Sequence, residues 1–242
     1  MALAQTLSVP HGNQPQLGDR WQNADGLPLV TELRELFPHG TLRRGSSIGI
    51  SGKVGHTSML LTLLAGPVAS GSWAAVVGLP ALGAEAASEF GVSLDRLALI
   101  PHPGNTWLEV TAALLDAIDV VALAPPGNCR PHDAQRLLAR ARERQSILVL
   151  IDDQLSGQPS GRSSLSRWPQ SPDVLLDITD CTWSGLGSGH GSLHHCSLSV
   201  TVGGRRLAGA SRSGHIHTGH PKIDSEPDTN REPGRPIFSI AR

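Results

Sequence analysis

A glycine-rich turn between an apolar strand and an apolar helix is the feature that most constrains the fold of this chain. Residues 48–61 read IGISGKVGHTSMLL. In P-loop proteins, a turn of this kind joins a buried strand to a helix, and its backbone N–H groups and a lysine hold phosphate. The segment therefore predicts a strand–loop–helix unit within an α/β sheet.

The turn lacks the residues with which a P-loop holds a triphosphate. With Gly55 as the second glycine of the motif, the lysine position holds His56 and the first glycine position holds Ile50. Gly52 and Thr57 are retained, and the Thr57 hydroxyl is the group that would meet Mg²⁺. Imidazole carries charge only near or below pH about 6.5 and is too short to replace a lysine. We expect no cofactor and no ATP hydrolysis, with a plain strand-to-helix turn or weak nucleotide binding as the open alternatives.

Composition limits the classes of function. The 242 residues carry a net charge of −1, so no global positive field indicates binding to DNA or to an acidic membrane surface. Cys129, Cys181 and Cys196 have no paired spacing and are expected to be reduced thiols. No apolar run approaches the ~18 residues of a membrane span, and the N-terminus lacks the apolar core of a signal peptide. These features predict a cytoplasmic protein.

Strand and helix patterns alternate through the middle of the chain. Strands are expected over residues 46–50, 73–79, 97–100, 120–124 and 147–151. Helices are expected over residues 27–37, 57–69, 82–90, 106–118 and 130–144. Near-continuous apolar strands separated by helices predict right-handed βαβ units and a mostly parallel sheet covered on both faces.

The pattern changes after Asp153. A loop rich in Ser, Gly and Pro is followed by expected strands over 174–178, 198–202 and 205–207, with a hairpin turn between the last two. This part of the chain predicts an antiparallel edge on the parallel sheet.

The two ends of the chain differ from the middle in composition. Residues 1–26 and 209–242 are polar and rich in Pro and Gly, without a sustained period, and are predicted to be disordered. The predicted organisation is one α/β domain over residues 27–208 with a disordered segment on each side.

The order of these elements resembles the RecA-like core. GTLRRGSSIGISG (residues 40–52) is similar to the segment that leads RecA into its P-loop. WAAVVGLPAL and EFGVSLDRLALIPH, within residues 73–102, are similar to its second strand, helix and third strand. The resemblance covers roughly residues 29–207 and implies a RecA-like fold.

Within this resemblance, the catalytic positions hold residues without the required chemistry. The glutamate that activates water falls at Leu79, the aspartate that ends the Walker B strand at Ala124, and the P-loop lysine at His56. Asp152 and Asp153 end the next strand, one strand too late for a Walker B aspartate. The combined loss of base, metal ligand and phosphate clamp implies that the protein is not an enzyme.

An inactive RecA-like core of this size resembles ImuA-prime, the RecA-like accessory protein of the actinobacterial mutasome. That resemblance implies a non-catalytic assembly role in the SOS response, in damage-induced mutagenic translesion DNA synthesis. The implied partner is ImuB, an inactive Y-family polymerase homologue, which links it to the sliding clamp and an error-prone C-family polymerase. The same losses fit a SulA-like cell-division inhibitor, and a weak RecA-like ATPase or DNA-binding protein is the other alternative.

If catalysis is absent, function must lie in surfaces. Ile237, Phe238 and Ile240 are an apolar cluster in the polar C-terminal segment. Such a cluster predicts a partner-binding segment that folds onto a groove or adds a strand to a sheet edge, with an incidental apolar run as the alternative.

Two arginine-containing segments are candidate contacts for DNA. Arg162, Arg167 and Trp168 lie in the loop that meets single-stranded DNA in RecA, and they combine charge with a stacking ring. They are too few for tight binding alone. The helix over 130–144 carries a stripe of arginines, which is either a solvated face or a contact with an acidic partner or DNA.

Histidines gather in the last third of the chain. The candidate metal ligands there are His190, His194, His195, Cys196, His215, His217 and His220. Their spacing does not match that of a zinc site, so no metal site is expected.

Overall fold

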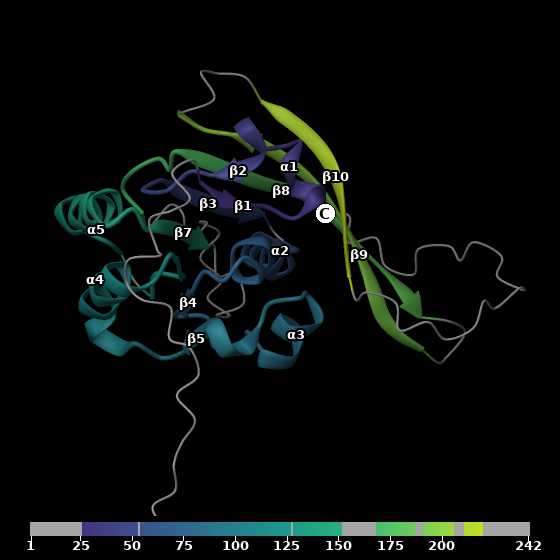
Figure 1. The fold of residues 1–242 in the computed structure, drawn as a ribbon, viewed down its shortest axis with the longest axis horizontal. Helices are drawn as coiled ribbons and strands as arrows, with labels where there is room; N and C mark the ends of the chain where they lie inside the picture. The colour runs from purple at the N-terminus through teal and green to yellow at the C-terminus, as the bar shows by residue number, and fades with distance from the viewer. Residues whose placement is uncertain are drawn as a thin grey trace, which may run out of the picture.

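Figure 1 shows the fold in a computed structural model, which describes residues 26–52, 54–126, 128–151, 168–186, 191–205 and 211–219. The predicted disordered ends therefore lie largely outside the described residues. No helix in these ranges combines the length and the apolar composition that crossing a bilayer requires.

The described residues form one eight-stranded sheet with the order β10-β9-β8-β3-β7-β6-β4-β5. Its strands are β3 (Ser47–Gly52), β4 (Ala74–Val77), β5 (Leu97–Ile100), β6 (Val120–Leu123), β7 (Ile147–Ile151), β8 (Val174–Leu186), β9 (Gly191–Gly203) and β10 (Arg212–Gly219). Neighbouring strands from β8 to β5 are parallel, whereas β9 and β10 are antiparallel additions. The predicted α/β class, mostly parallel sheet and antiparallel edge are confirmed.

Helices cover both faces of the parallel strands (Figure 1). They are α2 (His56–Ala69), α3 (Ala84–Glu89), α4 (Trp107–Ala117) and α5 (Pro131–Glu143), with short 3-10 turns η3 (Leu94–Arg96) and η4 (Gly104–Thr106). Side chains of β7 alternate between the faces: Val149 packs in the core with α2, and Leu150 packs in the core with α4 and α5. This alternation explains why the parallel strands are apolar at almost every position.

The segment before β3 departs from the predicted helix over residues 27–37. It holds β1 (Leu27–Pro28), the single-turn α1 (Thr31–Arg34), η2 (Pro38–Gly40) and β2 (Thr41–Leu42). Leu27 precedes a proline, which disfavours helical backbone there, and it pairs with Leu42 across a two-stranded sheet. Its apolar side chains still join the core on the α2 face.

The antiparallel edge is longer than predicted. The structure extends the expected strand 174–178 to Leu186, and β10 is a strand that pairs with β9. Of the expected strand 205–207, only Arg205 lies within the described residues. Because β10 ends at Gly219, the predicted domain boundary at residue 208 and the start of the predicted disordered tail at 209 are too early. Gly203 is the last residue of β9 and β10 begins at Arg212, so the predicted two-residue hairpin turn at Gly203 and Gly204 is not formed.

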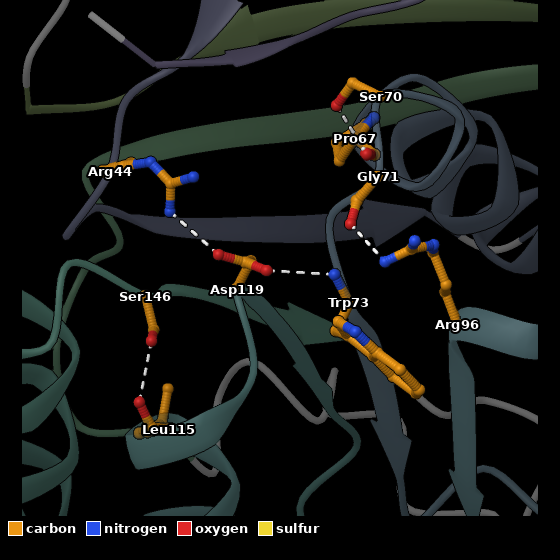
Figure 2. A network of polar contacts seen from close by, with 9 residues as sticks. All are labelled: Arg44, Pro67, Ser70, Gly71, Trp73, Arg96, Leu115, Asp119 and Ser146. Atoms are coloured by element: carbon orange, nitrogen blue, oxygen red, sulfur yellow. Dashed lines mark hydrogen bonds and ion pairs between the residues drawn. The ribbon is translucent and has the colours of Figure 1, made fainter. Parts of the chain in front are cut away.

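Buried polar contacts hold the amino-terminal ends of the strands together (Figure 2). The Asp119 carboxylate, just before β6, accepts hydrogen bonds from Arg44 Nη1 and from the backbone N–H of Trp73, each at 3.0 Å. Asp173, just before β8, accepts from both the backbone N–H and the hydroxyl of Ser47 at 3.0 Å. These contacts fix where the strands begin and leave their carboxyl ends on the opposite edge.

Candidate functional site at the carboxyl edge of the sheet

The strand order places a topological switch at β3. The chain leaves β3 through α2 and reaches β4 three places away, while β8 lies on the other side of β3. In open α/β sheets, ligands bind beyond the carboxyl ends of the strands at such a point. The structure therefore brings the turn at Gly55 to the same edge as Leu79 and Ala124, which follow β4 and β6. Lys53, Asp152 and Asp153 lie outside the described residues.

The turn at Gly55 is packed tightly against the antiparallel strands. Gly52 has φ 144° and Gly55 has φ 76°, and both values favour glycine. A Cβ built on Gly52 would lie 2.8 Å from Ile178 of β8, and one built on Gly55 would lie 2.6 Å from Leu198 Cδ2 of β9. The retained glycines thus meet a packing requirement of this fold, whether or not a phosphate binds.

His56 starts α2 and is enclosed by protein. Its side chain is buried, at 4% exposure, and Met59 N–H donates to Gly55 O at 2.9 Å in the first turn of the helix. Thr57 is half-buried beside it. A buried ring at the lysine position does not present a cation to a ligand outside the sheet edge.

Leu79 and Ala124 are apolar and buried, at 3% and 1% exposure. The backbone of β4 and β6 stays in close contact here: Ala124 N–H donates to Val77 O at 2.9 Å, and a Cβ on Gly78 would lie 2.4 Å from Ala124 O. Neither side chain can accept a proton or bind a metal ion. Among the described residues at this edge, positions 56, 79 and 124 thus hold a buried imidazole and two buried apolar side chains.

Two thiols lie beneath the turn, on β8 and β9. Cys181 Sγ is 3.4 Å from Cys196 Sγ, and it would be 3.3 Å from a Cβ on Gly55. The hydrogen bond between the two sulfur atoms lowers the pKa of the Cys181 thiol, while the same bond together with burial raises the pKa of Cys196. Sequence spacing missed this pair because the register of two facing strands brings the residues together. The strands expected from the sequence, 174–178 and 198–202, end before Cys181 and begin after Cys196, and only the longer β8 and β9 of the structure include the two cysteines.

The predicted DNA and partner contacts are only partly within the described residues. Trp168 is buried, at 4% exposure, in the core on the α4 and α5 face, so its ring is not displayed for stacking. Arg162 and Arg167 lie outside the described residues, as do the predicted partner-binding residues 237, 238 and 240.

Two arginines of the stripe at α5, Arg140 and Arg144, contact Asp116 of α4. Arg140 Nε donates to Asp116 Oδ1 at 2.7 Å and its Nη2 donates to the other carboxylate oxygen, while Arg144 Nε lies 3.0 Å from Oδ1. The Arg140 hydrogen bond is the main cause that holds the pKa of Asp116 below its usual range. These contacts give Arg140 and Arg144 a structural role within the protein.

The histidines on the antiparallel strands are spread over one face. His195, His215 and His217 are exposed, His215 Nδ1 is 3.1 Å from Ser199 Oγ, and Cys196 is buried on the opposite face. Within the part of the chain that the structure describes, no group of three potential ligands could hold a metal ion. His190 and His220 lie outside that part.

The fold and the site define a class: an α/β protein with a mostly parallel sheet and a P-loop-like turn that lacks its lysine. The family model described as the MT3502 N-terminal domain matches residues 35–157, slightly more than half of the chain, and the protein belongs to this family. The uncharacterized protein Rv3395c of Mycobacterium tuberculosis (strain ATCC 25618 / H37Rv) is 40% identical over 104 residues, which is 43% of this chain. The chain spans about half the length of that relative, at 51%.

Proposed function

We propose that this protein is a non-catalytic, RecA-like assembly factor in SOS-induced mutagenic translesion DNA synthesis, equivalent to ImuA-prime of the mutasome. Its proposed partner is the inactive Y-family polymerase homologue ImuB, and through it the sliding clamp and an error-prone C-family polymerase. The observation that carries the proposal is the burial of His56, Leu79 and Ala124 at the edge where a RecA-like enzyme works.

The strand order supports the RecA-like assignment. β6, which leads into Ala124, is separated from β3 by one strand, β7, which leads toward Asp152. In the RecA resemblance, β6 takes the place of the Walker B strand and β7 takes the place of the strand that follows it. An inactive site on such a scaffold leaves binding surfaces as the means of function.

The end of the domain supports a partner-binding tail. β10 is the last strand at one edge of the sheet, so the chain leaves the domain at that edge with 23 residues still to follow after Gly219. Ile237, Phe238 and Ile240 therefore follow a polar stretch that separates them in sequence from the folded core. Apolar anchors on a short segment supply most of the affinity in such interactions.

The test is a pull-down with the purified Y-family homologue and the full-length chain. The triple substitution Ile237→Ala, Phe238→Ala, Ile240→Ala should weaken binding by more than about tenfold, since buried anchors of this kind often contribute 2 kcal/mol or more each. Ser239→Ala, within the same segment, is the matched control and should bind as the wild type does. In cells, the triple variant should lose damage-induced mutagenesis.

Two results would contradict the proposal. Full affinity in the triple variant would remove the tail from the interface. Capture of a filament-forming division GTPase by the wild type, with cell filamentation on overexpression and no binding to the polymerase homologue, would favour the cell-division inhibitor instead.

A further inference from the structure

A pair of thiols on the antiparallel hairpin has a use that the proposed assembly role does not include. We propose that Cys181 and Cys196 form a redox-active dithiol site, which a peroxide-class oxidant converts into a disulfide between β8 and β9.

The backbone already places the two sulfur atoms together. Cys181 faces Leu198 and Cys196 faces Trp183 in the register of β8 and β9, so the cysteines are diagonal neighbours on one side of the hairpin. Their Sγ atoms are 3.4 Å apart, against about 2.05 Å in a disulfide, so side-chain rotation has little distance to close. Register shifts occur on both sides of Cys181 in β8, and such bulges increase the local twist of the strands.

The two thiols differ in the way that attacking and resolving cysteines differ. Cys181 is half-buried and accessible, whereas Cys196 is 1% exposed. The hydrogen bond between the two sulfur atoms lowers the pKa of Cys181 and, together with burial, raises the pKa of Cys196. A thiolate forms more readily on the accessible sulfur, which is the usual arrangement in redox-sensing cysteines.

The reaction balances with hydrogen peroxide as the oxidant. The Cys181 thiolate attacks one peroxide oxygen, the O–O bond breaks, and hydroxide leaves to give a sulfenic acid on Cys181. The Cys196 sulfur then attacks the Cys181 sulfur, its proton goes to the departing oxygen, and water leaves. In total, two thiols and one peroxide give one disulfide and two waters, with two electrons passing from sulfur to oxygen.

The site lies directly against the turn at Gly55, because a Cβ built on that glycine would lie 2.6 Å from Leu198 Cδ2 and 3.3 Å from Cys181 Sγ. A disulfide between Cys181 and Cys196 would therefore join β8 to β9 beside the start of α2. Cys129 provides an internal comparison: it packs on the opposite face of the sheet, and burial with the nearby Asp133 charge raises its pKa to about 11.

The experiment treats reduced, full-length protein with equimolar hydrogen peroxide under native conditions, alkylates the remaining thiols, and maps the peptides. The expected product is an intramolecular 181–196 disulfide with Cys129 alkylated. Cys129→Ser should form the same bridge. Cys196→Ser should stop at a dimedone-reactive sulfenic acid on Cys181, and Cys181→Ser should react at least about tenfold more slowly.

The wild-type peptide map decides the matter even if a variant folds poorly. Three results would overturn the proposal. Cys129 could be oxidised before Cys181 and Cys196, or the disulfide could join two molecules. The thiols at 181 and 196 could also stay reduced under conditions that oxidise free glutathione. A second readout is the fluorescence of Trp183, which faces Cys196 and should be quenched on oxidation and restored by dithiothreitol.

Discussion

Arg44 and Asp119 form a buried ion pair across 75 residues of sequence, with 3.0 Å between Nη1 and Oδ1. Their side chains are only 12% and 6% exposed. The second oxygen of Asp119 accepts from the Trp73 N–H, so one carboxylate fixes the approach to β3, the approach to β4 and the start of β6 (Figure 2).

Removing this carboxylate should destabilise the fold strongly. Asp119→Ala leaves a buried guanidinium and a backbone N–H without their acceptor, and breaking such a pair typically costs about 3–5 kcal/mol. The free energy of unfolding from urea titration measures the loss. Asp95→Ala, at an exposed position, is the control and should change stability by no more than about 0.5 kcal/mol. Equal effects of the two substitutions would contradict the role given to Asp119.

Three glycines with similar φ values should differ in their tolerance of alanine. Gly78, Gly55 and Gly91 have φ of 77°, 76° and 80°, so the backbone strain is the same, about 1 kcal/mol. A Cβ would meet the Ala124 carbonyl oxygen at 2.4 Å from Gly78, the Leu198 methyl at 2.6 Å from Gly55, and nothing within 4 Å from Gly91. Alanine at Gly78 should cost most, because a backbone carbonyl cannot move aside.

Alanine at Gly55 should cost an intermediate amount, about 1–3 kcal/mol beyond the cost at Gly91, since the Leu198 side chain can shift. Thermal unfolding of the three variants gives the order directly. A loss at Gly91 as large as that at Gly78 would mean that φ alone governs all three positions.

Mg·ATP should neither stabilise the protein nor be hydrolysed. A ligand that binds only the folded state raises the unfolding temperature, by an amount that grows with its concentration relative to Kd. With His56, Leu79 and Ala124 buried, we expect no shift at millimolar nucleotide and no phosphate release above the buffer rate. A saturable shift that Thr57→Ala removes would instead establish a working nucleotide site.

Asp116 should contribute a small, pH-dependent stabilisation. Arg140, and then Arg144, hold its folded-state pKa below the ordinary value of 3.8. A lowered folded-state pKa stabilises the protein above the unfolded pKa, and the effect disappears as pH falls through the folded-state pKa. Asp116→Asn should therefore cost at most about 1 kcal/mol at pH 7, because the pair is partly exposed, and nothing in strong acid. A difference from wild type that stays constant with pH would contradict this assignment.

The parallel part of the fold was predictable because its pattern is local. Two strands, 97–100 and 147–151, have the predicted bounds, since each is a short apolar run enclosed by helix signals. The helix 27–37 was wrong because a helical spacing of leucines outweighed the restriction that Pro28 places on the backbone. The strand β10 was missed because it is an edge strand rich in Gly, Ser, His and Thr, and such a composition is also typical of a polar disordered tail.

By itself, the sequence determined the class of the fold and the residue types that stand at the motif positions, since apolar periodicity and residue identity are local properties. Only the tertiary structure decided which distant residues meet. The Arg44–Asp119 pair, the packing of Gly55 on Leu198, the burial of Trp168 and the contact between two cysteines all depend on strand order and register. Those relations arise from packing whole elements against one another, and no spacing along the chain encodes them directly.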